Sequence, residues 1–311
     1  MMAPRRGGME VAKSVCMWQL IKQSVSDFLE DDCQTMAAAL AYYTVFSLPP
    51  LLVVIVTLAG FFLGAETVRE AVLEQAASLV GPRAAEQVQV MLSEGGAQTE
   101  GAWWKVLMGL GVLLFGATTA FAQLQAALNR AWEVEPDPNA GGARQFIGKR
   151  ILSFGFVLAL GFLLLVSMVL SAVLTGAGNW VAGRLGGLSG PLLEVLNLAV
   201  SLVIITALFA AIFKYLPDAR IAWEDVRTGA MATGFLFVVG KFLIGLYIGK
   251  SGLESPYGAA GAIILIFVWV YYSSMILLFG AELTQVWAER HGRRIEPEAG
   301  ARKMAAAQPG A

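Results

Sequence analysis

The chain has 311 residues, of which 57% are hydrophobic and only 14% are charged, and its mean hydropathy is +0.65. Soluble domains carry about 25% charged residues, so this composition excludes an ordinary soluble protein and indicates an integral membrane protein. The net charge of −1 lacks the basic excess that is typical of nucleic-acid-binding proteins, and we expect no nucleic-acid partner.

Residues 1–30 form a polar N-terminal segment that precedes the first apolar stretch. Apolar residues recur on one helical stripe from Val11 to Phe28, and Lys13 and Lys22 lie on the other side. This pattern predicts an amphipathic helix. Two interpretations stay open: the helix lies on the membrane surface, or it packs on the inner end of the helix bundle.

Residues 35–64 contain no charged side chain, and about 20 apolar residues are enough to cross a bilayer as a helix. Pro49 and Pro50 lie in the middle of this stretch, and each removes a backbone donor from the helix. The hydroxyl-bearing side chains just before them include those of Tyr42, Tyr43 and Ser47. We favour a kinked helix whose hydroxyls bond to the backbone. The alternative is a broken helix that lines a polar cavity.

Two amphipathic stretches follow within residues 65–100, joined at Gly81–Pro82, and they are too polar to span a membrane. They predict a small helical cap on the outer surface. Further apolar segments predict spans two to six at residues 106–129, 151–175, 195–213, 228–249 and 259–281. The expected fold is therefore an all-α membrane protein, with six transmembrane helices in a membrane domain at residues 31–288.

Lysine and arginine residues are unevenly distributed between the loops on the two sides of these spans. Most of the 22 fall in the N-terminal segment, in the loops after spans two and four, and in the tail. Cytoplasmic loops carry such an excess, so we expect both termini in the cytoplasm and residues 65–100 in the periplasm. The tail at residues 289–311 is charged and then low in complexity, and we expect it to be disordered.

Polar residues inside the spans are the candidates for function. Lys241 lies within span five, where it either faces a polar interior or extends its long side chain to the headgroups. Glu282 ends span six, and Asn129 ends span two, where a helix C-cap is the favoured interpretation. The sequence has no cluster of metal ligands and no nucleophile motif, so we expect no metal, no cofactor and no catalytic residue.

Five stretches together resemble the YihY/BrkB family of bacterial inner-membrane proteins. They are AAALAYYTVFSLPPLL (37–52), ALNRAWEV (127–134), YLPDARIAWEDVRTGA (215–230), GKFLIGLYIGKSG (240–252) and the stretch from Tyr257 to Ala288. The resemblance covers roughly residues 25–290. It implies a six-span inner-membrane protein with cytoplasmic termini, and its matching positions include Tyr42, Ser47, Pro50, Asn129, Tyr257 and Glu282. The family has no established activity, although some members carry a tRNA-processing ribonuclease label.

The sequence predicts a transporter-like or flippase-like protein for an amphipathic or envelope-related solute. Membrane lipids and an anionic or amphipathic solute are the expected partners, with Lys241 as the attracting charge. The candidate pathway residues are Tyr42, Tyr43, Ser47, Pro49, Pro50, Asn129, Lys241, Tyr257 and Glu282. The alternative is a structural or regulatory envelope protein without a transported substrate. We do not expect an enzyme, because RNA hydrolysis needs clustered ligands that activate water.

Overall fold

The computed structural model describes residues 6–97, 111, 119–138, 189–251, 254–292 and 295–304, and all structural statements refer to these residues. Predicted span three and half of predicted span two lie outside them. The helices are α1 (Arg6–Glu30), α2 (Cys33–Leu63), α3 (Ala65–Val80), α4 (Pro82–Ala97), α7 (Ser189–Tyr215), α8 (Trp223–Ser251) and α9 (Glu254–Arg290), together with a helical segment at 119–131.

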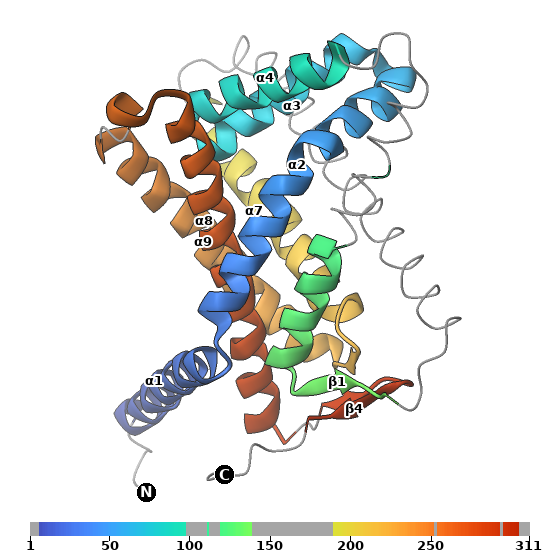
Figure 1. Cartoon of the computed structure of the whole chain (residues 1–311). Helices are drawn as coiled ribbons and strands as arrows, with labels where there is room; N and C mark the ends of the chain where they lie inside the picture. Colours follow the sequence, from blue (N-terminus) through green and yellow to red (C-terminus); the bar gives the residue numbers. More distant parts are fainter. Residues whose placement is uncertain are drawn as a thin grey trace, which may run out of the picture.

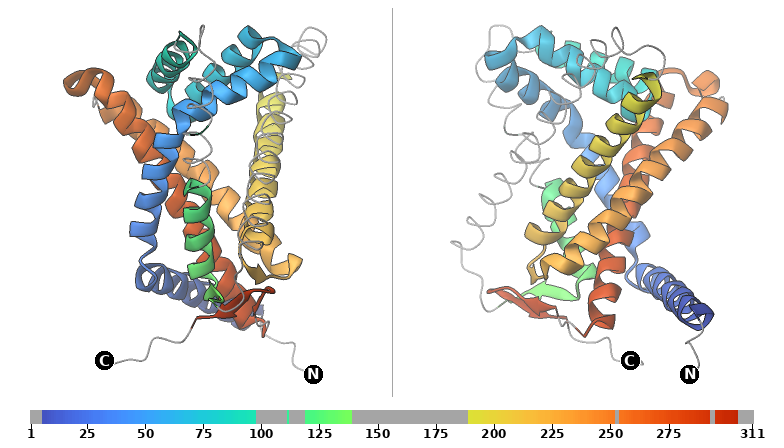
Figure 2. Two further views of the ribbon diagram at one scale, coloured as in Figure 1. Left: turned by 45° about the vertical axis from the view of Figure 1, so that its right-hand side comes forward. Right: turned by 180° about the vertical axis from the view of Figure 1, so that it is seen from behind.

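Helix α9 is the central element of the arrangement. It packs against α1, α2 and α8, while α7 packs against α8. Figure 1 shows α3 and α4 lying across one end of the long helices, which we call the cap end. Helix α1 and the short strands lie at the opposite end, which we call the base (Figures 1 and 2).

Three of the described helices are long and apolar enough to cross a membrane. The qualifying segments are Leu198–Tyr215 in α7, Trp223–Ile244 in α8 and Ile263–Arg290 in α9. They coincide with predicted spans four, five and six. The described residues therefore support a multi-helix membrane protein, and the count of six spans stays a prediction.

Helix α2 runs without interruption through Pro49, although the prolines remove backbone donors there. The hydroxyl of Ser47, which precedes them, donates to the carbonyl oxygen of Thr44 at 2.9 Å. The broken helix that we considered as the alternative is not observed. Of the favoured interpretation, a kinked helix whose hydroxyls bond to the backbone, the structure shows one continuous helix and the bond of Ser47, and the kink stays a prediction.

The cap agrees with the sequence pattern. Helices α3 and α4 meet at Gly81, whose φ of 112° lies in a region that favours glycine. A small cluster centred on Leu52, Val88 and Leu92 joins the cap to α2. This explains why two polar helices, each too short to span, stay attached to the end of the bundle.

Helices α8 and α9 contact each other through two reciprocal pairs of glycine and threonine. A side chain at Gly229 would overlap Thr284, and one at Gly280 would overlap Thr233. Each threonine hydroxyl donates to the carbonyl of the glycine four residues earlier in its own helix, at 2.7 Å for Thr233 and 2.6 Å for Thr284. The hydroxyls are therefore satisfied within their helices, and the two backbones approach closely.

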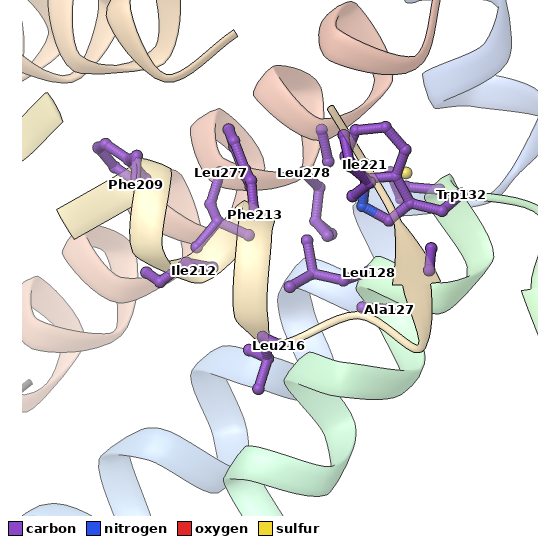
Figure 3. Packing of buried hydrophobic residues seen from close by; sticks show 14 of the residues in the cluster. Ala127, Leu128, Trp132, Phe209, Ile212, Phe213, Leu216, Ile221, Leu277 and Leu278 are labelled. Atoms are coloured by element: carbon purple, nitrogen blue, oxygen red, sulfur yellow. The ribbon is translucent and has the colours of Figure 1, made fainter. Parts of the chain in front are cut away.

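The main apolar core fills the space between α7, α9 and the helical segment 119–131 (Figure 3). Leu128, Phe213 and Leu278 have no exposed surface in it, and Trp132 is 1% exposed. Figure 3 shows Leu128 between Leu278 and Leu216, which come from the other two sides of this space. The core lies toward the base. The segments that form it also carry the buried polar side chains of the base, so the core holds these side chains in position.

The described residues are mostly helical, as expected, and four short strands add to the helices. β1 (Val134–Pro136) pairs antiparallel with β4 (Ala301–Lys303), and β2 (Ala219–Arg220) pairs with β3 (Glu296–Pro297). The expected disorder of the tail is wrong for residues 295–304, while residues 305–311 lie outside the described part. The tail is ordered here because its backbone groups bond to the loops that follow residues 131 and 216.

Candidate functional site

Glu282 is fully buried, and it is the centre of a polar network near the base. The Cys33 thiol, at the start of α2, donates to its Oε1 at 3.4 Å. Burial, followed by the nearby charge of Glu282, raises the pKa of the Cys33 thiol above its ordinary value. The thiol therefore stays protonated, and the contact joins α2 to α9 across 249 residues of sequence.

Gln285, one turn further along α9, extends this network to a third helix. With its amide nitrogen turned toward the carboxylate, the orientation that satisfies both amide atoms, it donates to Glu282 Oε2 at 3.2 Å. The same nitrogen donates to the carbonyl of Ala131 at 2.9 Å. Each carboxylate oxygen of Glu282 thus has an uncharged partner, Cys33 or Gln285, and the bond from Gln285 to Ala131 brings a third part of the chain into the network.

Asn129 anchors a second buried group, which connects the helical segment 119–131 to the loop after α7. Its side-chain nitrogen donates to Asp218 Oδ2 at 3.0 Å, and its side-chain oxygen accepts from the Asp218 backbone N–H at 2.8 Å. Gln125 donates to the other oxygen of the same carboxylate at 3.1 Å. Asn129 is therefore more than the expected helix C-cap, because it binds a loop 89 residues away.

Two basic side chains make further contacts with the loops at the base. Arg130 pairs with Asp31 at 3.1 Å, at the junction between α1 and α2. Lys214 donates to the carbonyl of Ile221 at 2.5 Å and lies 5.8 Å from the centre of the Trp223 ring. These interactions hold the α1–α2 junction against the helical segment 119–131, and the loop after α7 against α7.

A pocket of about 650 Å³ opens beside this network. The end of the helical segment 119–131, the end of α9 and the strands of the tail surround it. Its lining includes the side chains of Trp132, Glu133, Gln285, Glu289, Glu296 and Lys303. Gln285 belongs both to the lining and to the Glu282 network, so the pocket and the buried carboxylate share one residue.

The predicted pathway residues of α2 do not join this site. Tyr42 is 52% exposed, and its ring packs against its helix neighbours Tyr43 and Phe46. Ser47 is buried, and its hydroxyl donates to its own helix. Pro49 is half-buried on the same helix, and the side chain of Pro50 lies outside the described part. None of these contacts places an α2 hydroxyl beside Glu282 or Asn129.

Lys241 lies on α8, far from Glu282. Its neighbour Gly240 lies against Tyr272 of α9, ten residues before Glu282. At about 1.5 Å per helical residue, Lys241 is about 15 Å along the bundle from the carboxylate. We did not expect a direct pair between them, and the geometry agrees. The side chain of Tyr257 lies outside the described part.

Sequence reasoning did not identify several members of the site. Cys33 and Gln285 have no motif around them, and Asp218 belongs to a loop that gave no sign of its partner. The one usable signal was the spacing Gly-x-x-x-Thr, present at both Gly229 and Gly280, which is typical of close helix contacts. No three His, Cys, Asp or Glu side chains in the described ranges are placed to hold a metal ion.

The comparisons with known proteins give a consistent result. The family model described as virulence factor BrkB matches residues 24–305. A UPF0761 membrane protein of Pseudomonas paraeruginosa is 29% identical over 271 residues, which cover 85% of this chain and 62% of that protein. One from Pseudoalteromonas translucida is 28% identical, with 84% of this chain and 83% of the relative covered. One from Rhodospirillum centenum is 27% identical, with 89% and 59% covered.

The chain spans less than two thirds of the length of the first relatives in this comparison. The names of those relatives describe them as membrane proteins and specify no activity. No solved structure matches this chain.

Proposed function

The chain belongs to the virulence factor BrkB family of membrane proteins, and on this premise we propose that it is a transporter-like protein that takes up an amphipathic solute at its base. We place it in the bacterial inner membrane with the base in the cytoplasm, in line with the distribution of lysine and arginine. The observation that carries the proposal is the buried Glu282 network beside an open pocket.

Energetic reasoning supports a functional role for Glu282. Burying a carboxyl group costs free energy, and an apolar contact between three helices would stabilise the same junction at least as well. Ionisable residues within membrane helices commonly mark solute or ion paths. The partners of Glu282 are a thiol and an amide, and neither carries a positive charge. The junction is therefore less stable than one made by apolar side chains of the same volume.

The pocket supports a solute with a positively charged head group. Its volume of about 650 Å³ suits a small molecule or a lipid head group. Its charged lining consists of Glu133, Glu289 and Glu296 against Lys303. The buried indole N–H of Trp132 has no hydrogen-bond partner among the described residues and offers a donor beside these carboxylates. The anionic solute expected from Lys241 fits this lining less well than an amine.

A lipid translocation assay tests the proposal. Wild-type protein in phosphatidylethanolamine–phosphatidylglycerol vesicles should accelerate the exchange of a fluorescent phosphatidylethanolamine between leaflets, measured by dithionite quenching. Glu282→Gln keeps the shape of the side chain, and it should reduce this rate at least tenfold. Glu86→Gln, on the exposed surface of the cap helix α4, is the matched control and should leave the rate unchanged. A wild-type rate equal to that of empty vesicles would refute this function.

The alternative is a structural or regulatory envelope protein, and one observation favours it. The Gly–Thr contacts bring α8 and α9 so close that no added side chain fits between them at Gly229 or Gly280. A protein of this kind would show no translocation, and Glu282→Gln would change only its thermal stability.

We further propose that the chain is not an enzyme, and in particular not a ribonuclease. The purified protein, incubated with tRNA and Mg²⁺, Mn²⁺ or Zn²⁺, should leave the RNA intact on a denaturing gel. Cleavage that is lost when a carboxylate of the base pocket, such as Glu289, is changed to Gln would contradict this proposal.

A further inference from the structure

Helix α1 has three distinct sides, which a rotation of about 100° per residue separates. The buried side consists of Leu20, Ser24 and Phe28, with exposed fractions of 5%, 0% and 9%. A polar exposed side carries Gln19, Lys22, Gln23, Ser26 and Glu30. Between them lies a side that is both apolar and exposed, which we call the apolar ridge: Trp18, Ile21, Val25 and Leu29.

The buried side is fixed on the bundle. Phe28 packs edge-to-face against Phe279 of α9, with ring centres 6.1 Å apart. At the rim of this contact, Arg290 donates to the Gln23 side chain at 3.1 Å. α1 is therefore a docked helix, and its apolar ridge is not the surface that holds it in place.

The side chains of the apolar ridge are much more exposed than apolar side chains in the core. Trp18 is 68% exposed, Leu29 57% and Val25 43%. The four side chains of the ridge lie within about 80° of one another around the helix. A helix side of this kind, next to a polar side, is the pattern of helices that lie in the membrane interface.

The position of α1 in the chain identifies the surface that covers the ridge. α1 ends at Glu30, and α2 begins at Cys33 with 31 residues that carry no charge. The exposed side chains of α2 include Tyr42 and Phe46, at 52% and 64%, so an apolar surface continues upward from the base. α1 thus lies at the level where the chain enters the bilayer.

The composition of the ridge agrees with this level. Indole rings favour the headgroup region, and Trp18 is the most exposed apolar side chain of the described part of α1. Lys22, beside the ridge, can extend its ammonium group to the lipid phosphates. Four partly exposed side chains offer far less than the roughly 800 Å² that each partner buries in a standard protein interface.

We propose that the apolar ridge is a lipid-binding surface, which inserts into the headgroup region of the leaflet at the base. α1 then lies with one side on α9, one side in lipid and one side in water. The proposal needs only a membrane protein, and it is independent of whether a solute is transported. A second copy of the chain is the competing occupant that the experiment distinguishes.

Spin labels on single cysteines test the proposal. The background variant is Cys16→Ser, which retains the buried Cys33. Labels are placed at Trp18, Val25 and Leu29 on the ridge, and at the matched exposed polar positions Gln19, Ser26 and Glu30. The full chain is reconstituted in vesicles of phosphatidylethanolamine and phosphatidylglycerol at 3:1. Collision rates are measured with oxygen, which concentrates in lipid, and with a nickel chelate, which stays in water.

The ridge labels should show an oxygen-to-nickel ratio at least five times that of the polar labels. Equal ratios at all six positions would overturn the proposal, because both sides would then face water. Ridge labels that are shielded from both reagents, together with a Val25→Cys disulfide between copies, would overturn it in favour of a dimer. All six native side chains are exposed, so the variants keep the fold, and size-exclusion chromatography verifies this for each one.

Discussion

The two ends of the molecule are built by different means. At the cap end, Leu52, Val88 and Leu92 form a small aliphatic cluster, and all members of this cluster come from the consecutive helices α2, α3 and α4. At the base, buried polar side chains such as Glu282 and Asn129 join segments that lie 89 to 249 residues apart. Apolar contacts would have been enough to join helices at either end.

This difference indicates that the base contains buried groups that were not selected for stability alone. Buried polar groups contribute little net free energy when they are paired, and they are costly when a partner is lost. The cap can tolerate many apolar replacements, since its contacts only require volume. The base requires particular hydrogen-bonding atoms at particular positions. Such a requirement is typical of a functional site, and apolar packing at the cap does not have it.

The contact between α8 and α9 should give the largest effect. Gly280→Leu places a side chain where Thr233 lies, and Thr233 has little freedom to move because its hydroxyl is bonded to Gly229. Overpacking costs about 1–3 kcal/mol and more where neither side can yield. We expect loss of monodisperse protein after detergent extraction. A Gly111→Ala control meets nothing within 4 Å and should behave as wild type; normal yields of Gly280→Leu would show that the helices can separate.

The cap should respond locally. Leu92→Ala removes a buried side chain from the cluster that holds α4, and such changes cost about 2–5 kcal/mol. Amide hydrogen exchange should accelerate in α3 and α4 while the base retains its protection. Exchange that accelerates equally at Asn129 would mean that the two ends unfold as one unit, which would remove the contrast between them.

The second polar group of the base should be sensitive to the loss of one partner. Asn129→Leu keeps the volume but removes the amide that donates to Asp218 Oδ2 and accepts from the Asp218 backbone N–H, at a cost of about 1–3 kcal/mol. The thermal midpoint should fall. Gln125→Ala removes a part-buried donor to the same carboxylate and should lower the midpoint less. Equal midpoints for Asn129→Leu and wild type would show that Asp218 finds other partners.

Asp27 gives the smallest effect, and its sign depends on pH. Burial, then Glu30, raises its pKa in the folded protein above 3.8. The folded state therefore binds protons more readily, and its stability falls as pH rises from 3.8 through the raised pKa. Asp27→Asn should stabilise the protein at pH 7 by about 0.5 kcal/mol or less and should have no effect below pH 3.8. Thermal melts at both pH values check the prediction; a destabilisation at pH 7 would contradict it.

The sequence was informative where the signal is periodic. The apolar runs that became α7, α8 and α9, and the pair of polar helices in the cap, follow from composition and from the turn at Gly81–Pro82. The stripe on α1 predicted a docked helix and a membrane-surface helix as alternatives. The contact with α9 confirms the docked helix, and the membrane-surface position stays a prediction. Each of these features depends on neighbours within one or two helical turns.

The site was harder to predict because its contacts are distant in sequence. Glu282 and Asn129 were identified as candidates by their position in or beside spans, but their partners Cys33 and Asp218 were not. Nothing local marks a cysteine that will meet a carboxylate 249 residues later. The tail was predicted as disordered for the same reason: the strands at residues 296–303 have no local hydrophobic pattern, and they form because distant loops offer free backbone groups.

The two small sheets also set an order of events during synthesis. Residues 134–136 and 219–220 leave the ribosome before residues 296–303. β1 and β2 therefore cannot pair until α9 and the strands that follow it have been synthesised. The sheets then form at a base whose long helices have already been synthesised. Arg302 is consistent with the register, since it forms a 2.7 Å ion pair with Glu135. A ribosome-bound chain that stops before residue 296 would therefore carry its long helices without these sheets, and completion of the tail is the step that supplies the last part of the pocket lining.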